Sequence, residues 1–352
     1  MNPAAILLLA TTLGAQAPDQ LLLKDYRPRS IYRIPVTRVE KARFPVVDMH
    51  SHAYAETDEQ AAAWAATMDR SGIERTVVLV TGGGADFDAA VKRYGKFPRH
   101  FELWCGIDFT GSGRPGFAEG VVAELRRCRA AGAKGVGEVT DKGGGLAGNA
   151  GGMHLDDPRM DPILEACADL GLPINVHVGE DQWMYEPADA SNDGLMNAFT
   201  WKIADSPAIL RHDQVLATLD RAVARHPRTT FIACHLANCC QDLAQLAALL
   251  DRHANLYADI GARFAETAPV PRAAAQFIGR YQDRLLYGTD MGMDAAMYQI
   301  TFRILESEDE HFYEVEQFGY HWPLYGFGLE PGILRKLYRD NALALMKRVA
   351  RN

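Results

Sequence analysis

The chain has 352 residues, of which 48% are hydrophobic and 23% charged, with 45 acidic against 37 basic side chains. This composition is typical of a globular enzyme and excludes a disordered chain, a collagen-like repeat and a disulfide miniprotein. The net charge of −8 argues against a nucleic-acid partner, which would require a basic surface. No apolar run is long enough to span a bilayer as a helix. The six cysteines lack the spacing of a zinc finger or a redox motif.

Residues 1–17 form an apolar segment that ends in Ala15-Gln16-Ala17. The small-x-small ending is typical of a signal-peptidase site, so the segment predicts a signal peptide and export to the periplasm or the medium. The alternative is an apolar helix that packs on the domain, in which case the protein would be cytoplasmic. In either case we expect residues 18–43 to form an N-terminal extension that packs across the main domain. We expect the main domain itself over residues 44–352.

From residue 44 onward, short apolar or β-branched runs alternate with longer amphipathic, Ala-rich segments. The expected strands are 44–49, 75–80, 101–107, 133–139, 173–178, 229–234, 256–259 and 284–287. The expected helices are 59–70, 87–94, 115–131, 162–170, 212–225, 241–253 and 271–281, and a further helix is expected at the C-terminus. Eight strands that alternate with helices predict parallel βα units and hence an α/β fold, a TIM (β/α)8 barrel.

Three segments are too long to be simple connections. Residues 143–152 are rich in glycine and residues 180–207 follow the fifth expected strand, while 308–328 carries several aromatic side chains. Long loops at the carboxyl ends of barrel strands usually carry the chemistry of such enzymes. We therefore expect these segments to surround a site at the C-terminal mouth of the barrel.

Potential metal ligands stand at the ends of several expected strands. His50 and His52 are two residues apart at the end of the first strand, so both can reach one metal ion. His177, His235 and Asp290 close the fifth, sixth and eighth strands. Neutral imidazoles and a carboxylate suit Zn²⁺, and a catalytic zinc keeps one coordination position for water. The joint pattern predicts a divalent metal, most simply zinc, at the mouth of the barrel.

The chain resembles the amidohydrolase superfamily. The resemblance is carried by Asp48-Met49-His50-Ser51-His52, by the later strand-end residues and by the closing Leu337-Tyr338-Arg339-Asp340-Asn341-Ala342. It is strongest to the amidohydrolase-related group that includes aminocarboxymuconate semialdehyde decarboxylase. The resemblance implies a TIM barrel with a divalent metal at its mouth. It further implies the residue roles: the metal ligands would be His50, His52, His177 and Asp290, and the catalytic histidine beside the metal would be His235.

Glu138 adds a carboxylate to the fourth expected strand, where many members of the group lack one. The sequence Gly137-Glu138-Val139 is similar to a motif of TatD-like metal-dependent deoxyribonucleases, in which the glutamate helps to hold a second metal. The alternative is a structural ion pair of Glu138 with Lys134 or Arg263. We expect one metal with Glu138 near it, and the number of ions stays open between one and two.

These residues together predict a metal-dependent hydrolase of a C–N or C–O bond in a small organic substrate. Asp290 would take a proton from a metal-activated water, and His235 would hydrogen-bond the developing oxyanion. The alternative is a non-oxidative decarboxylase of a small carboxylated aromatic or diene. Arg263, Trp183 and Tyr185 are the candidate substrate contacts, because a guanidinium can hold a carboxylate and the rings can line the pocket. A homodimer is left open.

Overall fold

The structure is a computed structural model that describes residues 17–146, 152–197, 203 and 206–349. The predicted signal peptide lies outside the described residues apart from Ala17, and it stays a prediction. None of the described helices is both long and apolar enough to cross a membrane. All six cysteine side chains are buried, and none forms a disulfide.

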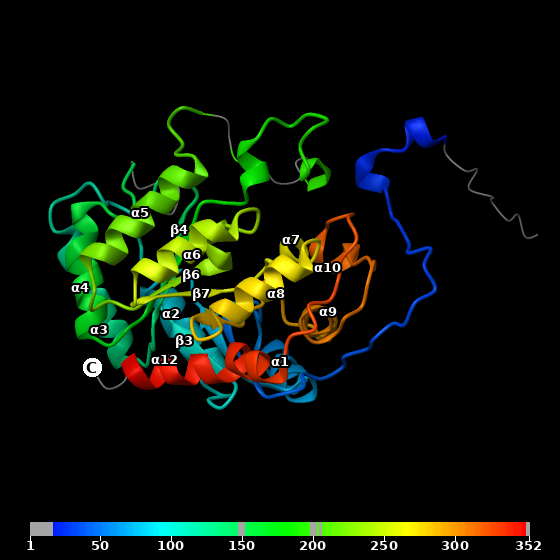
Figure 1. The fold of residues 1–352 in the computed structure, drawn as a ribbon. Helices are drawn as coiled ribbons and strands as arrows, with labels where there is room; N and C mark the ends of the chain where they lie inside the picture. Colours follow the sequence, from blue (N-terminus) through cyan, green and yellow to red (C-terminus); the bar gives the residue numbers. More distant parts are fainter. Residues whose placement is uncertain (1–16, 147–151, 198–202, 204–205, 350–352) are drawn as a thin grey trace, which may run out of the picture.

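The strands all run parallel, in the order of a barrel, which confirms the predicted α/β architecture (Figure 1). They are β1 (Val46–His52), β2 (Ile73–Leu79), β3 (Phe101–Trp104), β4 (Val136–Asp141), β5 (Ile174–Val178), β6 (Phe231–Ala233), β7 (Leu256–Asp259) and β8 (Leu285–Leu286). Each of the eight coincides with an expected strand to within a few residues. The alternation of apolar runs with helical segments was therefore a sufficient signal for the strand order.

The pairing is not continuous around the barrel. Strands β1 to β3 form one sheet and β4 to β8 form another. Backbone hydrogen bonds nevertheless cross both seams, for example from Gly137 N to Cys105 O at 2.9 Å and from Met49 N to Tyr287 O at 2.9 Å. The barrel therefore consists of two sheet sections that meet at two seams, where the regular strand ladder is interrupted but backbone hydrogen bonds continue.

The main helices cover the outside of the strands. They are α1 (Asp58–Ser71), α2 (Gly84–Tyr94), α3 (Phe117–Ala130), α4 (Asp161–Asp169), α5 (His212–Arg225), α6 (Leu243–Arg252), α8 (Pro271–Arg280), α9 (Ala295–Glu306) and α12 (Asn341–Val349). The sequence did not predict α9. Helix α1 begins with a capping box in which Thr57 and Gln60 satisfy each other's backbone N–H groups, and it ends at Gly72 with φ of 83°. A left-handed residue of this kind favours glycine at a helix C-terminus.

A compact apolar cluster fills the barrel interior below the mouth. It includes Val47 and Met49 of β1 with Leu79 and Trp104, and Leu345 of α12 closes it from the N-terminal end of the strands. A regular strand would point Met49 and His50 to opposite faces. The register of β1 against β2 shifts between Asp48 and Ser51, and both Met49 and His50 face the interior.

The N-terminal extension lies on the outside of the barrel, beside the segment 308–328 (Figure 1). The backbone N and Oγ1 of Thr37 donate to the carboxylate of Asp309 at 2.8 and 2.7 Å. Arg27 Nη1 lies 2.9 Å from His321 Nε2. The extension therefore braces the segment 308–328, which in turn covers part of the mouth of the barrel.

Candidate metal centre

Six side chains with metal-binding atoms converge at the C-terminal mouth of the barrel. They come from the end of β1 (His50 and His52), from β4 (Glu138), from β5 (His177) and from the turns after β6 and β8 (His235 and Asp290). Two groups of them, one of which also includes Cys234, place their ligand atoms within 4.8 Å of one another. The predicted ligands His50, His52 and Asp290 thus lie together with Glu138, which the sequence placed near the metal, and His177 joins the cluster through its contact with Glu138.

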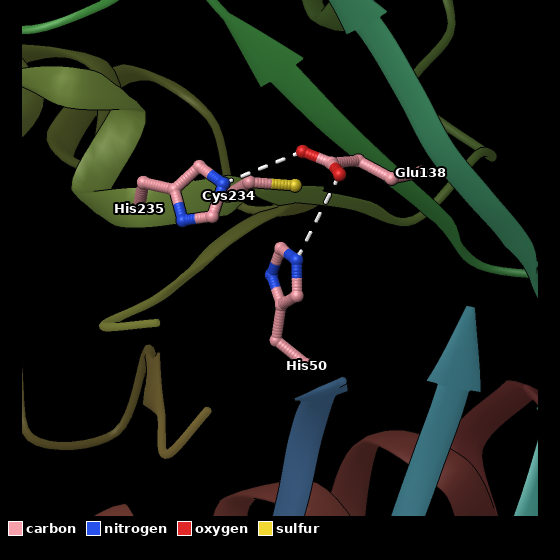
Figure 2. A group of neighbouring side chains, drawn as sticks. All are labelled: His50, Glu138, Cys234 and His235. Carbon is pink, nitrogen blue, oxygen red and sulfur yellow. Dashed lines mark hydrogen bonds and ion pairs between the residues drawn. The ribbon is translucent and has the colours of Figure 1, made fainter. Parts of the chain in front are cut away.

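Glu138 occupies the centre of the cluster (Figure 2). Its Oε1 lies 2.6 Å from His177 Nδ1 and 3.3 Å from His235 Nε2. Its Oε2 lies 3.3 Å from His52 Nε2 and 3.9 Å from His50 Nε2. The alternative partners, Lys134 and Arg263, do not contact Glu138 among the ion pairs of the described residues. Glu138 is therefore a component of the centre and not part of a peripheral ion pair.

Asp290 closes the other side of the cluster. Its Oδ1 lies 3.0 Å from His52 Nε2 and 3.6 Å from His50 Nε2, and its Oδ2 lies 3.6 Å from His235 Nε2. The hydroxyl of Tyr54, two residues beyond the His-x-His pair, approaches Asp290 Oδ1 at 3.4 Å. This carboxylate is in position both to bind a cation and to exchange a proton with a group in the cavity.

The tautomer of His50 is fixed by a buried carboxylate. His50 Nδ1 donates to Asp259 Oδ2 at 2.9 Å, so in the neutral ring Nε2 carries the lone pair that faces the cluster. This Nε2 is buried and has no hydrogen-bond partner among the described residues. Asp259 itself is fully buried and also accepts from Asn175 Nδ2 and from the backbone N–H of His235. An imidazole with its outer nitrogen held by a carboxylate is the usual arrangement of a metal-binding histidine.

Two further imidazoles are oriented by backbone carbonyls. His177 Nε2 donates to Gly179 O at 2.9 Å, and His235 Nδ1 donates to Gly261 O at 2.8 Å. His177 also donates from Nδ1 to Glu138 Oε1 at 2.6 Å, because its hydrogen bonds to Glu138 and Glu180 outweigh burial and raise its pKa to about 9. A neutral His235 presents an unprotonated Nε2 to Glu138, so it can donate to an oxyanion only in its protonated form, and this expected role stays a prediction. The donor set of imidazole nitrogens and carboxylate oxygens fits a divalent cation such as Zn²⁺ or Mn²⁺.

The electric field of the carboxylates favours positive charge at this position. Burial lowers the pKa of His50, but the nearby carboxylates of Asp259 and Asp290 outweigh it and raise the pKa to about 9. Burial likewise opposes the charged form of His52, whose hydrogen bonds to Asp290 and Glu138 raise its pKa to about 10. The pKa of His235 is lowered, mainly by burial. In the metal-free protein, His50 and His52 therefore carry protons that neutralise these carboxylates. A bound cation could neutralise the same carboxylates in their place.

The backbone at the centre adopts an uncommon conformation. His235 and the three residues after it have φ between 53° and 58°, and Asp290 has φ of 54°. Non-glycine residues in the left-handed region cost about 1–3 kcal/mol each when their surroundings force them there, and they concentrate at functional sites. Hydrogen bonds hold both turns, from His235 N to Asp259 Oδ1 at 3.0 Å and from Asp290 N to His50 O at 2.9 Å.

A cavity of about 390 Å³ opens beside the centre, a volume typical of a small-molecule site. Its walls include His177, His235 and Asp290 from the centre itself. The rings of Trp183, Phe318 and Tyr320 and the cationic groups of Lys142 and Arg263 also line it. Two of the expected substrate contacts, Trp183 and Arg263, thus lie at the cavity, and the segment 308–328 supplies part of its cover.

Arg263 is already surrounded by acceptors. Its guanidinium lies 3.4 Å from Glu180 and from Asp181 and 3.7 Å from Glu266, and it donates to Asn238 Oδ1 at 2.9 Å. These carboxylates balance its charge, so a substrate carboxylate would have to compete with them. Its expected role as a carboxylate clamp stays a prediction.

Tyr185 is not among the described residues that line this cavity. Its hydroxyl accepts from the backbone N–H of Glu180 at 3.1 Å, and its ring lies near His212. It supports the loop that follows β5. Its role in binding substrate stays a prediction that the geometry does not favour.

Sequence reasoning missed three residues around the centre. Asp259 ends β7 and thus showed the same strand-end signal as the predicted ligands. Glu180 follows β5 and lies 3.3 Å from His177 Nε2, and Tyr54 follows the His-x-His pair. Position at the mouth could have suggested all three, but the partners of Asp259 and Tyr54 come from distant parts of the chain.

The comparisons with known proteins agree with this geometry. A family model described as amidohydrolase matches residues 36–348. No curated protein sequence matches the chain. A TIM-barrel protein of Bordetella bronchiseptica is similar in structure, with a TM-score of 0.53 at 16% identity over 87% of this chain and all of that one.

Two decarboxylases are also similar in structure. A 2,6-dihydroxybenzoate decarboxylase bound to 2,6-dihydroxybenzoate has a TM-score of 0.53 at 16% identity, over 86% of this chain and 99% of that one. A 5-carboxyvanillate decarboxylase from Novosphingobium aromaticivorans, bound to manganese and a nitrobenzoic acid, has a TM-score of 0.53 at 13% identity, over 89% of this chain and all of that one. At such low identity these likenesses show the fold alone, and they confirm a TIM-barrel architecture.

Proposed function

The chain belongs to the amidohydrolase family of enzymes, and on this basis we propose that it is a metal-dependent decarboxylase of a small carboxylated aromatic compound. The observation that carries the proposal is the cavity beside the metal centre, in which flat rings and the predicted ligands His177 and Asp290 line the same space. Trp183 and Tyr320 suit the faces of an aromatic ring, and Lys142, which lines the same cavity, pairs with Glu180. The two decarboxylases of similar structure act on carboxylated phenols, as their names state, which supports the same choice.

A divalent cation at the centre would bind anionic oxygens of the substrate and withdraw electron density from them. The protein itself would then accept one proton and later return it. Asp290, ionised because nearby histidines keep its pKa low against the effect of burial, would accept the proton of a phenolic hydroxyl. As the bond between ring and carboxyl carbon breaks and carbon dioxide leaves, Asp290 would return this proton to the ring carbon, which keeps the electron pair.

The second candidate function is the hydrolysis of a C–N or C–O bond, which the sequence favoured. One observation supports it: two carboxylates, Glu138 and Asp290, face the same imidazoles. Such a pair suits the activation of a water, with Asp290 as the group that takes its proton. The comparisons favour decarboxylation over this alternative, because both of the similar enzymes described above are decarboxylases.

One assay separates the two functions. The purified protein, loaded with Mn²⁺ or Zn²⁺, is supplied with 2,6-dihydroxybenzoate, with 5-carboxyvanillate, and with a panel of amides, esters and lactones. We expect release of carbon dioxide from a carboxylated phenol, which a chelator abolishes and added metal restores. Hydrolysis of a member of the panel without any release of carbon dioxide would instead establish the second function.

A further inference from the structure

A second large cavity lies at the opposite end of the barrel from the metal centre. Its volume is about 870 Å³, within the range of small-molecule sites. Thr230 and Asn255 in its wall directly precede β6 and β7, so the cavity opens at the N-terminal ends of these strands. Among the described residues it shares no wall with the cavity beside the metal centre.

Three arginines from separate elements line this second cavity. They are Arg228, which follows α5, Arg252 at the end of α6, and Arg348 in α12. The only carboxylate in the described part of the wall is that of Asp169. Three positive charges thus face one negative charge here, although the chain as a whole has a net charge of −8.

Two of these arginines have partners that satisfy them only in part. Arg228 Nη1 lies 2.7 Å from Asp169 Oδ1. Arg252 Nη2 and His253 Nε2 share one carboxylate, that of Asp220, at 2.9 and 2.5 Å. Because exposed ion pairs contribute little free energy and a guanidinium has five N–H donors, both arginines keep donors for a further anion.

Arg348 has no acidic partner among the described residues. Its guanidinium lies 5.2 Å from the centre of the Tyr257 ring, and its Nη2 donates to Thr230 Oγ1 at 3.1 Å. Arg284 lies at the same distance of 5.2 Å from this ring, and it also forms no ion pair within the described part of the chain. Burial and the charge of Arg348 lower the pKa of Arg284. The positive charge of these two side chains is therefore not neutralised by an ion pair.

We propose that this cavity binds a small polyanion, a compound that carries at least two phosphate or carboxylate groups. Planar guanidinium groups form paired hydrogen bonds with the oxygens of such groups, and three of them converge on the cavity. Thr230 Oγ1 accepts from Arg348 and keeps its own proton for the same anion. The side chains of Val223 and Pro227 in the wall suit the carbon skeleton of the ligand. The proposal does not depend on which bond the metal centre breaks.

The first test maps the site in the full chain and does not depend on turnover. The protein is treated with phenylglyoxal, which modifies accessible arginines, in the presence of pyrophosphate, of citrate, or of sodium chloride at equal ionic strength. The rate of modification of each arginine is measured from peptide masses. Metal-loaded and chelated protein are both used, because the two probes also bind divalent cations.

We expect Arg228, Arg252 and Arg348 to react about tenfold more slowly when a polyanion is present at about ten times its Kd, because the bound ligand covers them. Arg280 is the internal control, since its side chain is 67% exposed and paired with an aspartate, like that of Arg228, but does not line the cavity. Protection by pyrophosphate alone would identify a phosphorylated ligand, and protection by citrate alone a polycarboxylate. Unchanged rates with both probes, or equal slowing at Arg280, would overturn the proposal.

Calorimetry on variants provides the second test. The double variant Arg228→Gln/Arg348→Gln should bind the protecting probe at least ~10-fold more weakly, because charge-assisted hydrogen bonds are lost. Arg280→Gln should bind it as the wild-type protein does. Equal affinity of the double variant and the wild-type protein would place the anion elsewhere on the molecule and refute the site. If the double variant does not fold, the protection pattern of the wild-type protein still decides.

Discussion

Asp259 Oδ2 accepts the Nδ1 proton of His50 at 2.9 Å, and this one contact decides which nitrogen of His50 faces the metal centre. The same carboxylate also accepts the backbone N–H of His235 at 3.0 Å, so it positions groups on both β1 and the turn after β6. Asp259 acts on the centre through His50 and His235. It is a positioning residue.

Replacement of Asp259 by Asn should weaken metal binding by about 10- to 100-fold, because the amide cannot hold His50 in the same tautomer as strongly. A competition titration with a chromophoric chelator measures the affinity for Zn²⁺. The matched control is Asp141→Asn, since Asp141 is also fully buried and pairs with an imidazole, that of His154, at 2.7 Å. Equal loss of affinity in both variants would show a general effect of burial and not the positioning of His50.

Asp290→Asn should reduce kcat by at least ~10², because the amide can neither accept nor return a proton. Metal content is measured alongside kcat on whichever substrate the assay finds. Asp294→Asn is the control on the same loop, because Asp294 caps α9 through Met297 N and lies outside the centre. Normal turnover of the metal-loaded Asp290→Asn protein would refute the assigned proton transfer.

The stability of the metal-free protein should fall as the pH rises from about 6.5 to 10. The pKa of His50 is raised to about 9 and that of His52 to about 10, so the folded state binds these protons more tightly than the unfolded state does. Their stabilising effect is complete below the unfolded pKa of about 6.5 and is lost as the pH passes the folded values. Metal binding instead strengthens over this range, because protons no longer compete for the nitrogens.

The gap in melting temperature between the metal-loaded and the chelated protein should therefore widen with pH. Thermal unfolding at several pH values between 6.5 and 10, with Zn²⁺ or with a chelator, measures it. A gap that is constant or narrows would contradict the assignment of these histidines as ligands.

Asn341→Ala should lower the free energy of unfolding by about 1–3 kcal/mol, because it leaves a buried carbonyl, that of Leu285, and a partly buried one, that of Gln282, without this donor. Asn341 Nδ2 donates to Gln282 O at 2.7 Å and to Leu285 O at 2.8 Å, and thus ties α12 to the start of β8. Lys347→Ala on the exposed face of the same helix is the control. Chemical denaturation of both variants provides the comparison, and equal stability would contradict the proposed role.

The sequence predicted the strand order and the ligands for one physical reason. Side chains at the carboxyl ends of parallel strands must meet at one mouth, so His50, His177 and Asp290 could be placed together without knowledge of their contacts. Helix α9 was missed because no element was expected between Asp290 and the cover segment 308–328, where α9 lies. The role of Asp259 was missed because its importance depends on a partner 209 residues away.

The contacts that each side chain makes with particular partners could also not be predicted from the sequence. Charge alone suggested that Arg263 could hold a substrate carboxylate, but three carboxylates of the protein already surround it. The position of Glu138 on β4 suggested that it lies near a metal, but only the structure shows that its Oε1 faces His177 and its Oε2 faces His52. Such relations depend on rotamers and register shifts that no local pattern encodes.

Because the residues of the metal centre come from both sections of the barrel, metal binding would also affect the mechanical integrity of the protein. His50 and His52 belong to the section β1–β3, and Glu138 and His177 belong to the section β4–β8. A cation held between these residues would cross-link the two sections where the strand ladder is interrupted. We expect chelation to loosen the contact between the sections, so that a protease should cut the metal-free protein near the ends of β3 and β4 before it attacks the interior of either section.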